Sequence, residues 1–508
     1  MNDKICGYYL DTEQQAIVLD ESKYLLVVAG AGSGKTLTIL GKINYLFKYK
    51  NIDKDEILCI SFTRAASVSL KDKIKNEFNV DLPVYTFHKL SLEILNEFGI
   101  KHQIASTDTL NNIIHEFIYI IVLNYEKYMD LILKYFKVKY KNKEQYIKFL
   151  DENYLKIQGF ETLISTFIHL LKCNGYDLSS FNKFLIQIKK NIFKYKHEKT
   201  FLIITLNIYL KYEQYLKDNN EIDFDDMIID ATKELDKNIL NKKYKYIIID
   251  EYQDTSYVRF LLIKKILDIT CASLMVVGDD FQSIYRFTGC DLSLFLDFNK
   301  YFNNPKIMKI QNTYRNCQEL INIAGNFVMK NKKQIYKNLK SSKHIDYPIQ
   351  IIYYDNIKKE FLNIILKIYN ETKKSILVLG RNNNDINLIL DKNHFKYKDD
   401  IIIYLNNPDI KIRYLTVHKS KGLEDENVIM INLENKINGF PNQIKDEKIL
   451  RLVSPNFEKY PYSEERRLFY VALTRTKNYV YLLVPKNNES IFVKEIKKDY
   501  KDKIKIFN

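Results

Sequence analysis

The stretch Tyr24–Thr36, which reads YLLVVAGAGSGKT, decides the fold. Its apolar part, Leu25–Ala29, has the length and composition of a buried parallel strand. Glycines follow at alternate positions, and Lys35 and Thr36 then open a segment whose apolar residues recur at helical spacing. Glycines allow backbone N–H groups to approach an anion, and the first turn of a helix adds a favourable dipole. We therefore predict a site for the phosphates of a nucleotide.

Within this site, Lys35 is expected to reach the β- and γ-phosphates, and the Thr36 hydroxyl is expected to bind Mg²⁺. The strict phosphate-loop pattern has glycine where this chain has Ala29, which is a minor departure. The alternative is a glycine turn beside a surface lysine, and the strand before it and the helix after it argue against that. The residues predicted to surround the phosphates are Ala29, Gly30, Ala31, Gly32, Ser33, Gly34, Lys35 and Thr36.

Length and charge limit the class of protein. The 508 residues predict several domains, roughly three or four. The net charge of +15 favours a polyanionic partner. However, the abundance of Lys, Ile, Asn and Tyr, which an AT-rich genome would produce, explains the charge equally well. Charge alone therefore does not identify the partner.

The six cysteines are scattered, have no CxxC pair and form no ligand cluster with the eight histidines. We therefore predict buried free thiols in a reducing cytoplasm and no zinc site. The N-terminus lacks the pattern of a signal peptide, and no apolar stretch is long enough to span a bilayer. The expected protein is cytoplasmic and has no membrane partner.

Two further apolar strands end in side chains suited to nucleotide hydrolysis. Tyr246–Ile249 is followed by Asp250, which can hold Mg²⁺, and by Glu251, which can polarise the attacking water. Adjacent acids are common on surfaces, but they rarely follow a buried strand. Gln282 follows the strand at 274–277 and can sense a γ-phosphate. Because ligands of open α/β sheets bind at these carboxyl ends, we expect the three side chains in one site.

The rest of the chain predicts two lobes and an insertion. Residues 101–200 have long helical patterns and predict a helical subdomain inserted in the first lobe. The second half repeats strands and helices without a second phosphate loop, but it carries Arg315, Arg381 and Arg475. We therefore expect one nucleotide between two lobes. An arginine from the second lobe would stabilise the transition state, which is typically worth ~10³–10⁵ in rate.

The chain resembles the superfamily 1 DNA helicases of the UvrD/Rep/PcrA type over nearly its whole length. The motifs that carry the resemblance, in the family's order, are LDTEQ (10–14), AGAGSGKT (29–36), SFTRAA (61–66), TFHKL (86–90), DFDD (223–226), IIIDEYQDTS (247–256), VGDDFQSIYRF (277–287), NTYRN (312–316), TVHKSKGLE (416–424) and EERRLFYVALTRT (464–476). The resemblance implies an α/β P-loop NTPase with two RecA-like parallel-sheet domains. ATP would bind in the cleft between them, and single-stranded DNA would cross the top.

The implied domains are 1A (residues 1–100 and 201–290), the helical insertion 1B (101–200) and 2A (291–508). Members of the family insert a regulatory domain, 2B, between the positions of Arg381 and Thr416. Here that stretch has room for a helix and a strand only, so 2B is expected to be essentially absent. We infer a reduced motor whose restraint or targeting comes from another polypeptide.

The resemblance also assigns roles in the nucleotide site. Gln14 would read the adenine edge, and Tyr314 would stack on the base. Leu37 stands where relatives often have an arginine, so the base would pack on aliphatic carbon. Glu424 would contact the ribose. The implied catalytic residues are Lys35, Asp250, Glu251, Gln282, Arg315 and Arg475, of which the last three would contact the γ-phosphate.

The positions that the resemblance implies for DNA binding are Phe62, Thr63, Thr86, His88, Tyr285, Phe287, Thr416 and His418. Phe62, Tyr285 and Phe287 are the candidates for stacking on bases. Phe287 and Thr288 replace a Trp–Arg pair of the relatives. This replacement leaves a smaller stacking platform and one cation fewer beside the DNA.

Two hypotheses of function follow. The first is an ATP- and Mg²⁺-dependent translocase and helicase on single-stranded or tailed duplex DNA, with 3′→5′ polarity implied by the resemblance alone. The second is an NTPase and DNA-sensing subunit that regulates a partner nuclease in a Gabija-like anti-phage defence complex, with little unwinding of its own. A P-loop enzyme acting on small molecules conflicts with the DNA-side motifs. The sequence leaves the pathway open among repair, replication restart and defence.

Overall fold

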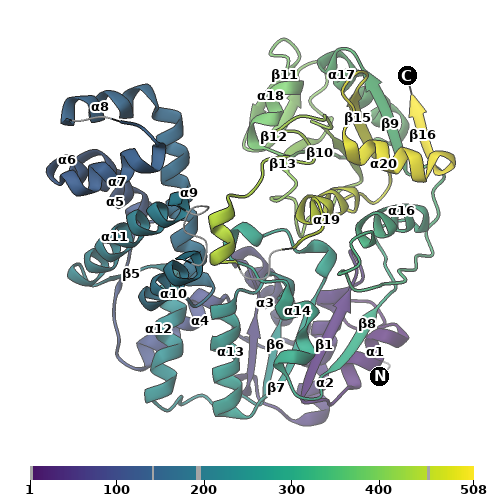
Figure 1. Ribbon diagram of the computed structural model, residues 1–508. Coiled ribbons are helices and arrows are strands. Elements are labelled where there is room, and N and C mark those ends of the chain that lie inside the picture. The colour runs from purple at the N-terminus through teal and green to yellow at the C-terminus, as the bar shows by residue number, and fades with distance from the viewer. Residues whose placement is uncertain (1–3, 140–141, 190–195, 455–457, 508) are drawn as a thin grey trace.

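The computed structural model describes residues 4–139, 142–189, 196–454 and 458–507. It contains two α/β lobes, each built on one sheet, and a helical subdomain attached to the first lobe (Figure 1). The N-terminal end lies in the first lobe and the C-terminal end in the second (Figure 1). The predicted fold class is therefore confirmed.

The first lobe is built on a six-stranded parallel sheet in the order β3-β2-β6-β7-β1-β8. Its strands are β1 (Tyr24–Ala29), β2 (Ile57–Ile60), β3 (Val84–Tyr85), β6 (Tyr246–Ile249), β7 (Ser273–Gly278) and β8 (Lys306–Ile310). Helices α2 and α3 cover one face, and α4, α12 and α13 cover the other. Because both faces are covered, the inner strands are continuous apolar runs, as the sequence predicts.

The helices of this lobe are α1 (Thr12–Leu19), α2 (Lys35–Lys50), α3 (Arg64–Phe78), α4 (Phe87–Glu97), α12 (Phe224–Lys237), α13 (Tyr257–Thr270), α14 (Ser293–Leu296) and α15 (Phe298–Tyr301). The lobe does not end at residue 290 as expected, because β8 pairs in parallel with β1. β8 was missed because it is an edge strand whose first residues are exposed, so its sequence, KIMKI, lacks a buried apolar run.

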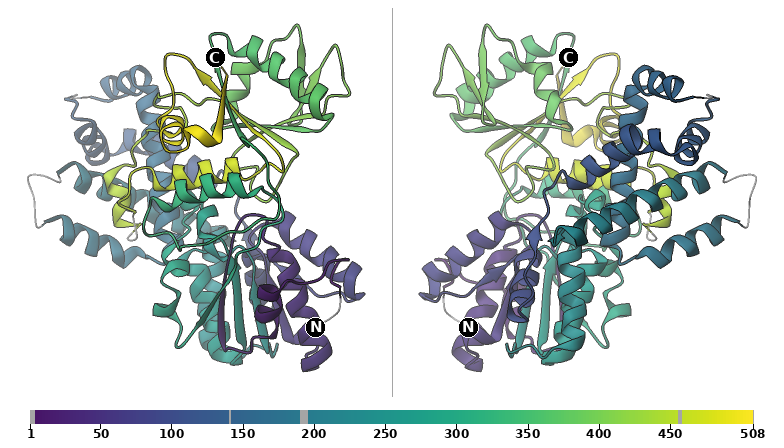
Figure 2. Two further views of the ribbon diagram at one scale, coloured as in Figure 1. Left: turned by 90° about the vertical axis from the view of Figure 1, so that its right-hand side faces the viewer. Right: turned by 90° about the vertical axis from the view of Figure 1, so that its left-hand side faces the viewer.

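The helical subdomain consists of α5 (Thr109–Glu116), a π-helical turn (Phe117–Ile121), α6 (Val122–Asn124), α7 (Glu126–Phe136), α8 (Lys143–Glu152), α9 (Tyr154–Cys173), α10 (Leu178–Lys189) and α11 (Lys196–Asp218). The expected boundary at residue 200 falls inside α11, so the subdomain is longer than predicted. A two-stranded sheet, β4 (Gln103–Ile104) with β5 (Glu221–Ile222), closes its base. The subdomain projects from the first lobe, beside the second (Figure 2).

The second lobe is built on an eight-stranded sheet in the order β11-β12-β13-β10-β14-β15-β9-β16. Its strands are β9 (Ile349–Tyr354), β10 (Ile376–Gly380), β11 (Phe395–Lys398), β12 (Ile401–Tyr404), β13 (Ile412–Thr416), β14 (Asn427–Met430), β15 (Val480–Pro485) and β16 (Ile504–Phe507). The pairs β11–β12 and β12–β13 are antiparallel, and the others are parallel. Instead of the expected single helix and strand, the stretch before Thr416 forms a short helix, the β11–β12 hairpin and β13.

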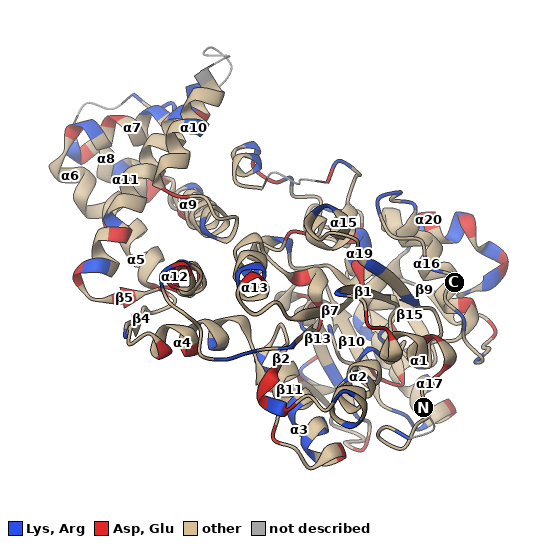
Figure 3. Ribbon diagram, turned by 90° about the horizontal axis from the view of Figure 1, so that it is seen from below, with Lys and Arg blue, Asp and Glu red and all other residues tan. Residues whose placement is uncertain are grey.

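Helices α16 (Gln318–Met329), α19 (Ser463–Leu473) and α20 (Ile491–Asp499) cover one face of this sheet, and α17 (Ile357–Thr372) and α18 (Ile386–Ile389) cover the other. All six cysteines are free thiols, but the expectation that they are buried is wrong for Cys6 and Cys271, which are exposed. Among the described residues, no helix combines the length and the apolar character that crossing a bilayer requires. In the view from below, Lys and Arg are interspersed with Asp and Glu along the ribbon (Figure 3).

Candidate active site between the two lobes

The phosphate loop connects β1 to α2 and lies against the second half of the chain. Gly32 has a φ of 69°, which L side chains rarely adopt. A Cβ on Gly32 would lie 2.4 Å from the Cβ of Arg315, and one on Gly30 would lie 2.5 Å from Leu339 Cδ2. The glycines are therefore required both by the turn and by the close approach of the segment that follows β8.

Lys35 and the two predicted carboxylates come together at the carboxyl edge of the first sheet. Lys35 Nζ lies 3.1 Å from Glu251 Oε1. Burial by itself lowers the pKa of Lys35, but the charges of Glu251, Asp279 and Asp250 raise it above its ordinary value. Burial likewise opposes ionisation of Glu251, yet Lys35 and Lys421 hold its pKa below the usual range. Lys35 and Glu251 are therefore an ion pair at neutral pH.

For Asp250, burial and neighbouring charge together raise the pKa instead of lowering it, and this carboxylate is suited to bind a metal ion. Burial and the neighbouring charge of Glu251 raise the pKa of Asp250, because Lys35 compensates this carboxylate only in part. Its Oδ1 accepts a hydrogen bond from the Glu251 N–H at 2.9 Å. A carboxylate and the hydroxyl of Thr36 are hard oxygen donors, the kind that Mg²⁺ prefers. The donor set thus fits Mg²⁺, which would supply the missing positive charge.

Gln282 and Arg475 connect the two lobes beside this site. Gln282 Nε2 donates to Asp279 Oδ2 at 2.5 Å, and Arg475 Nη2 donates to Gln282 Oε1 at 3.1 Å. Arg475 is only 1% exposed, and burial together with the nearby Arg315 lowers its pKa to about 9. Its Nη1 also donates to the Leu423 carbonyl at 3.1 Å. The predicted γ-phosphate residues of both lobes therefore contact each other directly.

Arg315 and Glu424, expected on the γ-phosphate and on the ribose, are paired with each other. Arg315 Nε donates to Glu424 Oε2 at 2.6 Å. Tyr314, whose backbone N–H donates to the Gly32 carbonyl at 3.0 Å, presents an exposed ring. Its hydroxyl donates to Asp11 Oδ2 at 2.8 Å. The ring is thus held next to the phosphate loop, where a base can stack on it.

Gln14 supports the phosphate loop from behind. It is fully buried. Its Oε1 accepts from the Asp11 N–H at 3.0 Å, and its Nε2 donates to the Ser33 carbonyl at 3.2 Å. Contact with an adenine edge would require Gln14 to be uncovered. Leu37, one turn into α2, is half-buried between the two hydrophobic clusters on that side of the lobe.

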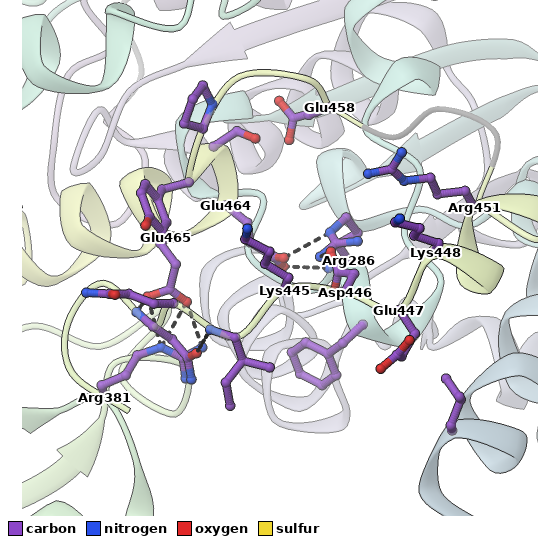
Figure 4. Close-up of a pocket in the computed structure, with 18 of the residues that line it drawn as sticks. Arg286, Arg381, Lys445, Asp446, Glu447, Lys448, Arg451, Glu458, Glu464 and Glu465 are labelled. Atoms are coloured by element: carbon purple, nitrogen blue, oxygen red, sulfur yellow. Dashed lines mark hydrogen bonds and ion pairs between the residues drawn. The ribbon is translucent and has the colours of Figure 1, made fainter. Parts of the chain in front are cut away.

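A groove of about 1590 Å³ lies between the helical subdomain and both lobes (Figure 4). Of the predicted DNA residues, Phe287, Thr416 and His418 line it. Phe287 is 57% exposed and lies edge-on to His418, with 5.6 Å between ring centroids. The exposed ring gives a base an aromatic surface to stack on.

Tyr285 lies behind this surface. Its ring stacks on Phe62 at 5.7 Å and 15°, and its hydroxyl donates to the His418 carbonyl at 3.1 Å. Thr63 and Thr86 are helix N-caps, whose hydroxyls accept from the backbone N–H groups of Ala66 and Lys89. These four predicted DNA residues therefore have structural partners of their own.

The two histidines of the predicted DNA set are neutral. Burial, with Arg259 nearby, lowers the pKa of His88 to about 4. Burial, with Arg381 and Lys421 nearby, lowers that of His418 to about 4 as well. At pH 7 both imidazoles can form hydrogen bonds, but neither carries a positive charge. His418 lines the groove, whereas His88 is not among its lining residues and lies edge-on to Phe224.

Sequence reasoning missed the wall of the groove, to which residues 442–449, 451 and 458–465 contribute. Arg286 Nη2 lies 2.8 Å from Asp446 Oδ2, and Arg286 Nε lies 3.0 Å from Glu464 Oε2 (Figure 4). Arg381, considered above with the hydrolytic arginines, lies instead in this groove and pairs with Glu465 at 2.7 Å. The charged run of residues 445–448, KDEK, was the only signal in the sequence, and such runs usually mark solvated loops.

The DFDD motif attaches the helical subdomain to the first lobe. Asp223 and Asp226 pair with Lys172 Nζ at 2.7 and 2.6 Å, and Asp225 pairs with His169 at 2.8 Å. The expectation that no histidine clusters with a cysteine is wrong, because His169, Cys173 and Asp225 come together here. No signal in the sequence indicated this cluster, because Asp225 lies far along the chain from His169 and Cys173.

Comparisons with known proteins agree with this geometry. Residues 10–303 match the model of the UvrD/REP helicase N-terminal domain, and residues 393–487 match that of the UvrD-like helicase C-terminal domain. DNA helicase IV of Escherichia coli (strain K12) is 27% identical over 504 residues, which cover 96% of this chain and 70% of that protein.

Two further relatives are similar over shorter lengths. The ATP-dependent DNA helicase Rep of Buchnera aphidicola (subsp. Acyrthosiphon pisum) is 29% identical over 83% of this chain and 57% of its own length. The ATP-dependent DNA helicase PcrA of Bacillus subtilis (strain 168) is 26% identical over 68% of this chain and 42% of its own length. The chain thus spans about half the length of these two relatives.

Proposed function

The chain belongs to the UvrD/REP helicase family, and from this premise we propose that it hydrolyses ATP between its lobes and thereby moves along single-stranded DNA. The observation that carries the proposal is the contact between Arg475 of the second lobe and Gln282 of the first. Any ligand that recruits either side chain must change how the two lobes meet. Hydrolysis is thereby coupled to movement.

Each polar group of the crevice has a task in this reaction. Lys35 and the loop N–H groups would hold the β- and γ-phosphates, with Mg²⁺ on Thr36 and Asp250 to offset their charge. Glu251 would orient and polarise the attacking water once Lys35 turns from it to the phosphate. Arg315 and Arg475 would exchange Glu424 and Gln282 for the γ-phosphate. The same pairs hold the crevice together before ATP enters.

The groove is the proposed path of the strand. It runs beside the crevice, carries the exposed ring of Phe287, and is lined by Lys419, Lys445 and Lys448. Aromatic rings and flexible cations suit single-stranded DNA, whose bases can stack and whose phosphates need counter-charge. Single-stranded or tailed duplex DNA is therefore the proposed substrate, with 3′→5′ movement inferred from family resemblance.

A strand-displacement assay tests the proposal. The expected result is release of a labelled strand from 3′-tailed duplexes with ATP and Mg²⁺, and not from 5′-tailed or blunt ones. Single-stranded DNA should also raise the ATPase rate severalfold. Absence of stimulation by DNA of any length at low salt would contradict the proposal. Release from 5′-tailed but not from 3′-tailed duplexes would contradict the proposed 3′→5′ polarity, but not the proposed helicase activity.

A second candidate is a nucleotide- and DNA-sensing subunit that controls a partner nuclease, as in a Gabija-like defence complex. The observation that favours it is the short stretch between β10 and β13, which holds only the β11–β12 hairpin and short helical turns. Regulation would then come from another chain. Robust unwinding by the purified protein alone, without a co-purifying partner, would exclude this candidate.

A further inference from the structure

The junction between the helical subdomain and the first lobe contains a cluster that helicase chemistry does not use. His169 and Cys173 are four residues apart on α9, so they lie on the same face of the helix. Asp225 of α12 lies opposite them, with its two carboxylate oxygens turned one to each side chain. The three ligand atoms all lie within 4.8 Å of one another.

The separations fit one ion held by all three residues. With Nδ1 as the histidine ligand, this nitrogen lies 3.8 Å from Cys173 Sγ and 2.8 Å from Asp225 Oδ2, and Cys173 Sγ lies 3.2 Å from Asp225 Oδ1. Ligand bonds of about 2.3 Å to sulfur and about 2.0 Å to nitrogen and oxygen put the corners of a tetrahedral zinc site roughly 3.3–3.6 Å apart. Shifts of up to about half an ångström would therefore convert the cluster into such a site.

The chemical character of the cluster selects the metal. Thiolate and imidazole are borderline to soft ligands, which favour Zn²⁺ over the Mg²⁺ of the nucleotide crevice. Cys173 is fully buried, whereas the His169 side chain is 40% exposed and gives an ion a route from solvent. We propose that His169, Cys173 and Asp225 bind one Zn²⁺ ion, with water in the fourth position.

Charge balance supports this assignment. Binding replaces the thiol proton of Cys173 with the metal and releases that proton to solvent, so a thiolate and the Asp225 carboxylate together neutralise Zn²⁺. The positive charge of Arg259 favours the deprotonated forms of all three residues, which are the forms that bind a metal ion. Without metal, Asp225 accepts from both partners and the buried thiol stays protonated, because burial raises the pKa of Cys173.

The ion would fasten the subdomain where it meets the groove. Cys173 Sγ lies 3.7 Å from the Thr288 carbonyl, directly after Phe287. A Cβ on Gly289 would lie 2.4 Å from Cys173 Cβ, so the loop that carries Phe287 packs closely against the site. A zinc ion would hold α9, α12 and this loop in one arrangement, beside the Lys172 ion pairs that already join α9 to α12.

Metal analysis and cobalt substitution of the full chain test the proposal independently of any helicase activity. The purified protein should retain one equivalent of zinc after gel filtration. Exchange for Co²⁺ should produce a near-ultraviolet thiolate-to-cobalt band and the visible absorption of tetrahedral cobalt. Cys173→Ser should lose the near-ultraviolet band, and Cys271→Ser, which removes an exposed thiol, should keep it.

The thermal midpoint provides a second readout. Zn²⁺ at micromolar concentration should raise the Tm of the chelator-treated wild type and leave that of Cys173→Ser unchanged. If Cys173→Ser does not fold, His169→Gln serves in its place, because its side chain is partly exposed. Two results would overturn the proposal and leave a hydrogen-bonded cluster. One is retention of less than a tenth of an equivalent of zinc by the wild type. The other is a thiolate-to-cobalt band that persists in Cys173→Ser.

Discussion

The nucleotide crevice and the groove beside it are built in opposite ways. In the crevice, nearly every charged side chain already has a partner from within the molecule: Lys35 pairs with Glu251, Arg315 with Glu424, and Lys421 with Asp254. In the groove, Arg286 and Arg381 are also paired, but the ring of Phe287 faces open space and His418 is neutral. A nucleotide must therefore displace internal partners in the crevice, whereas a base can stack on Phe287 without displacing one.

This difference makes the two sites separable by mutation. Substitutions in the crevice should abolish turnover and leave DNA affinity largely intact, because the groove has its own contacts. Substitutions in the groove should weaken DNA binding and leave DNA-independent hydrolysis unchanged. A variant that changes both to the same degree would show that the two sites form one unit.

The largest effect is expected from Lys35→Ala. Loss of the only loop cation removes the charge that holds the β- and γ-phosphates and leaves Glu251 without its partner. ATP turnover should fall to the background of the assay, while the anisotropy of a labelled single strand reports unchanged binding. The matched control is Lys50→Ala at the exposed end of the same helix, which should hydrolyse ATP at the wild-type rate.

Arg475→Lys should have the next largest effect. Lysine keeps the positive charge, but it cannot reproduce the forked contacts with Gln282 and Leu423. We expect kcat for ATP to fall about 10³-fold with a small change in KM, because an arginine that stabilises transferring phosphate acts in the transition state. Arg413→Lys, on β13 of the same lobe, is the control. A change in KM alone would mean that Arg475 only helps to bind ATP.

The crevice was predictable from sequence because local patterns specify it. Gly32 must adopt a positive φ, Lys35 must begin a helix, and Asp250 and Glu251 must follow a buried strand, so each constraint is visible in a few residues. Motif resemblance added the expected contact of Arg315 and Arg475 with the γ-phosphate. The pairing of these arginines with Glu424 and Gln282 was not predicted, because it depends on how two distant segments pack.

The groove wall and the helical junction were not predictable for the same reason. Ile449 and Val453 belong to the hydrophobic core of the helical subdomain, although they lie in the second half of the chain. They sit in or next to the 3-10 helix η7 (Lys448–Leu452), which is too short for a periodic pattern. Asp225 meets His169 and Cys173 only after α9 packs on α12. Such contacts carry no local signal.

Phe287→Ala should weaken the binding of single-stranded DNA in the groove, with an effect of intermediate size. Stacking of a base on an aromatic ring is worth about 1–3 kcal/mol, so affinity for single-stranded DNA should fall roughly 5- to 150-fold. ATP hydrolysis without DNA should not change, since Phe287 is not part of the crevice. Tyr154→Ala removes an equally exposed ring of the subdomain, and it should leave affinity unchanged. Equal losses in both variants would argue for nonspecific contacts.

The smallest effect concerns pH and stability. Burial lowers the pKa of His88 and of His418 to about 4, so folding disfavours their charged forms. The unfolded chain takes up these protons near the ordinary pKa of about 6.5. Their contribution to stability is therefore complete above pH 6.5 and is lost progressively as pH falls towards 4.

The Tm should accordingly drop by several degrees between pH 7 and pH 5, and His88→Gln should reduce that drop. His102→Gln, which changes an exposed histidine, is the control and should leave the slope unchanged. DNA affinity between pH 6.5 and 8 should not depend on the charge of His88 or His418, because both stay neutral there. The opposite result would be a steep rise in DNA affinity below pH 7 that His418→Gln removes. In that case the groove, like the crevice, would bind its ligand through a charged side chain.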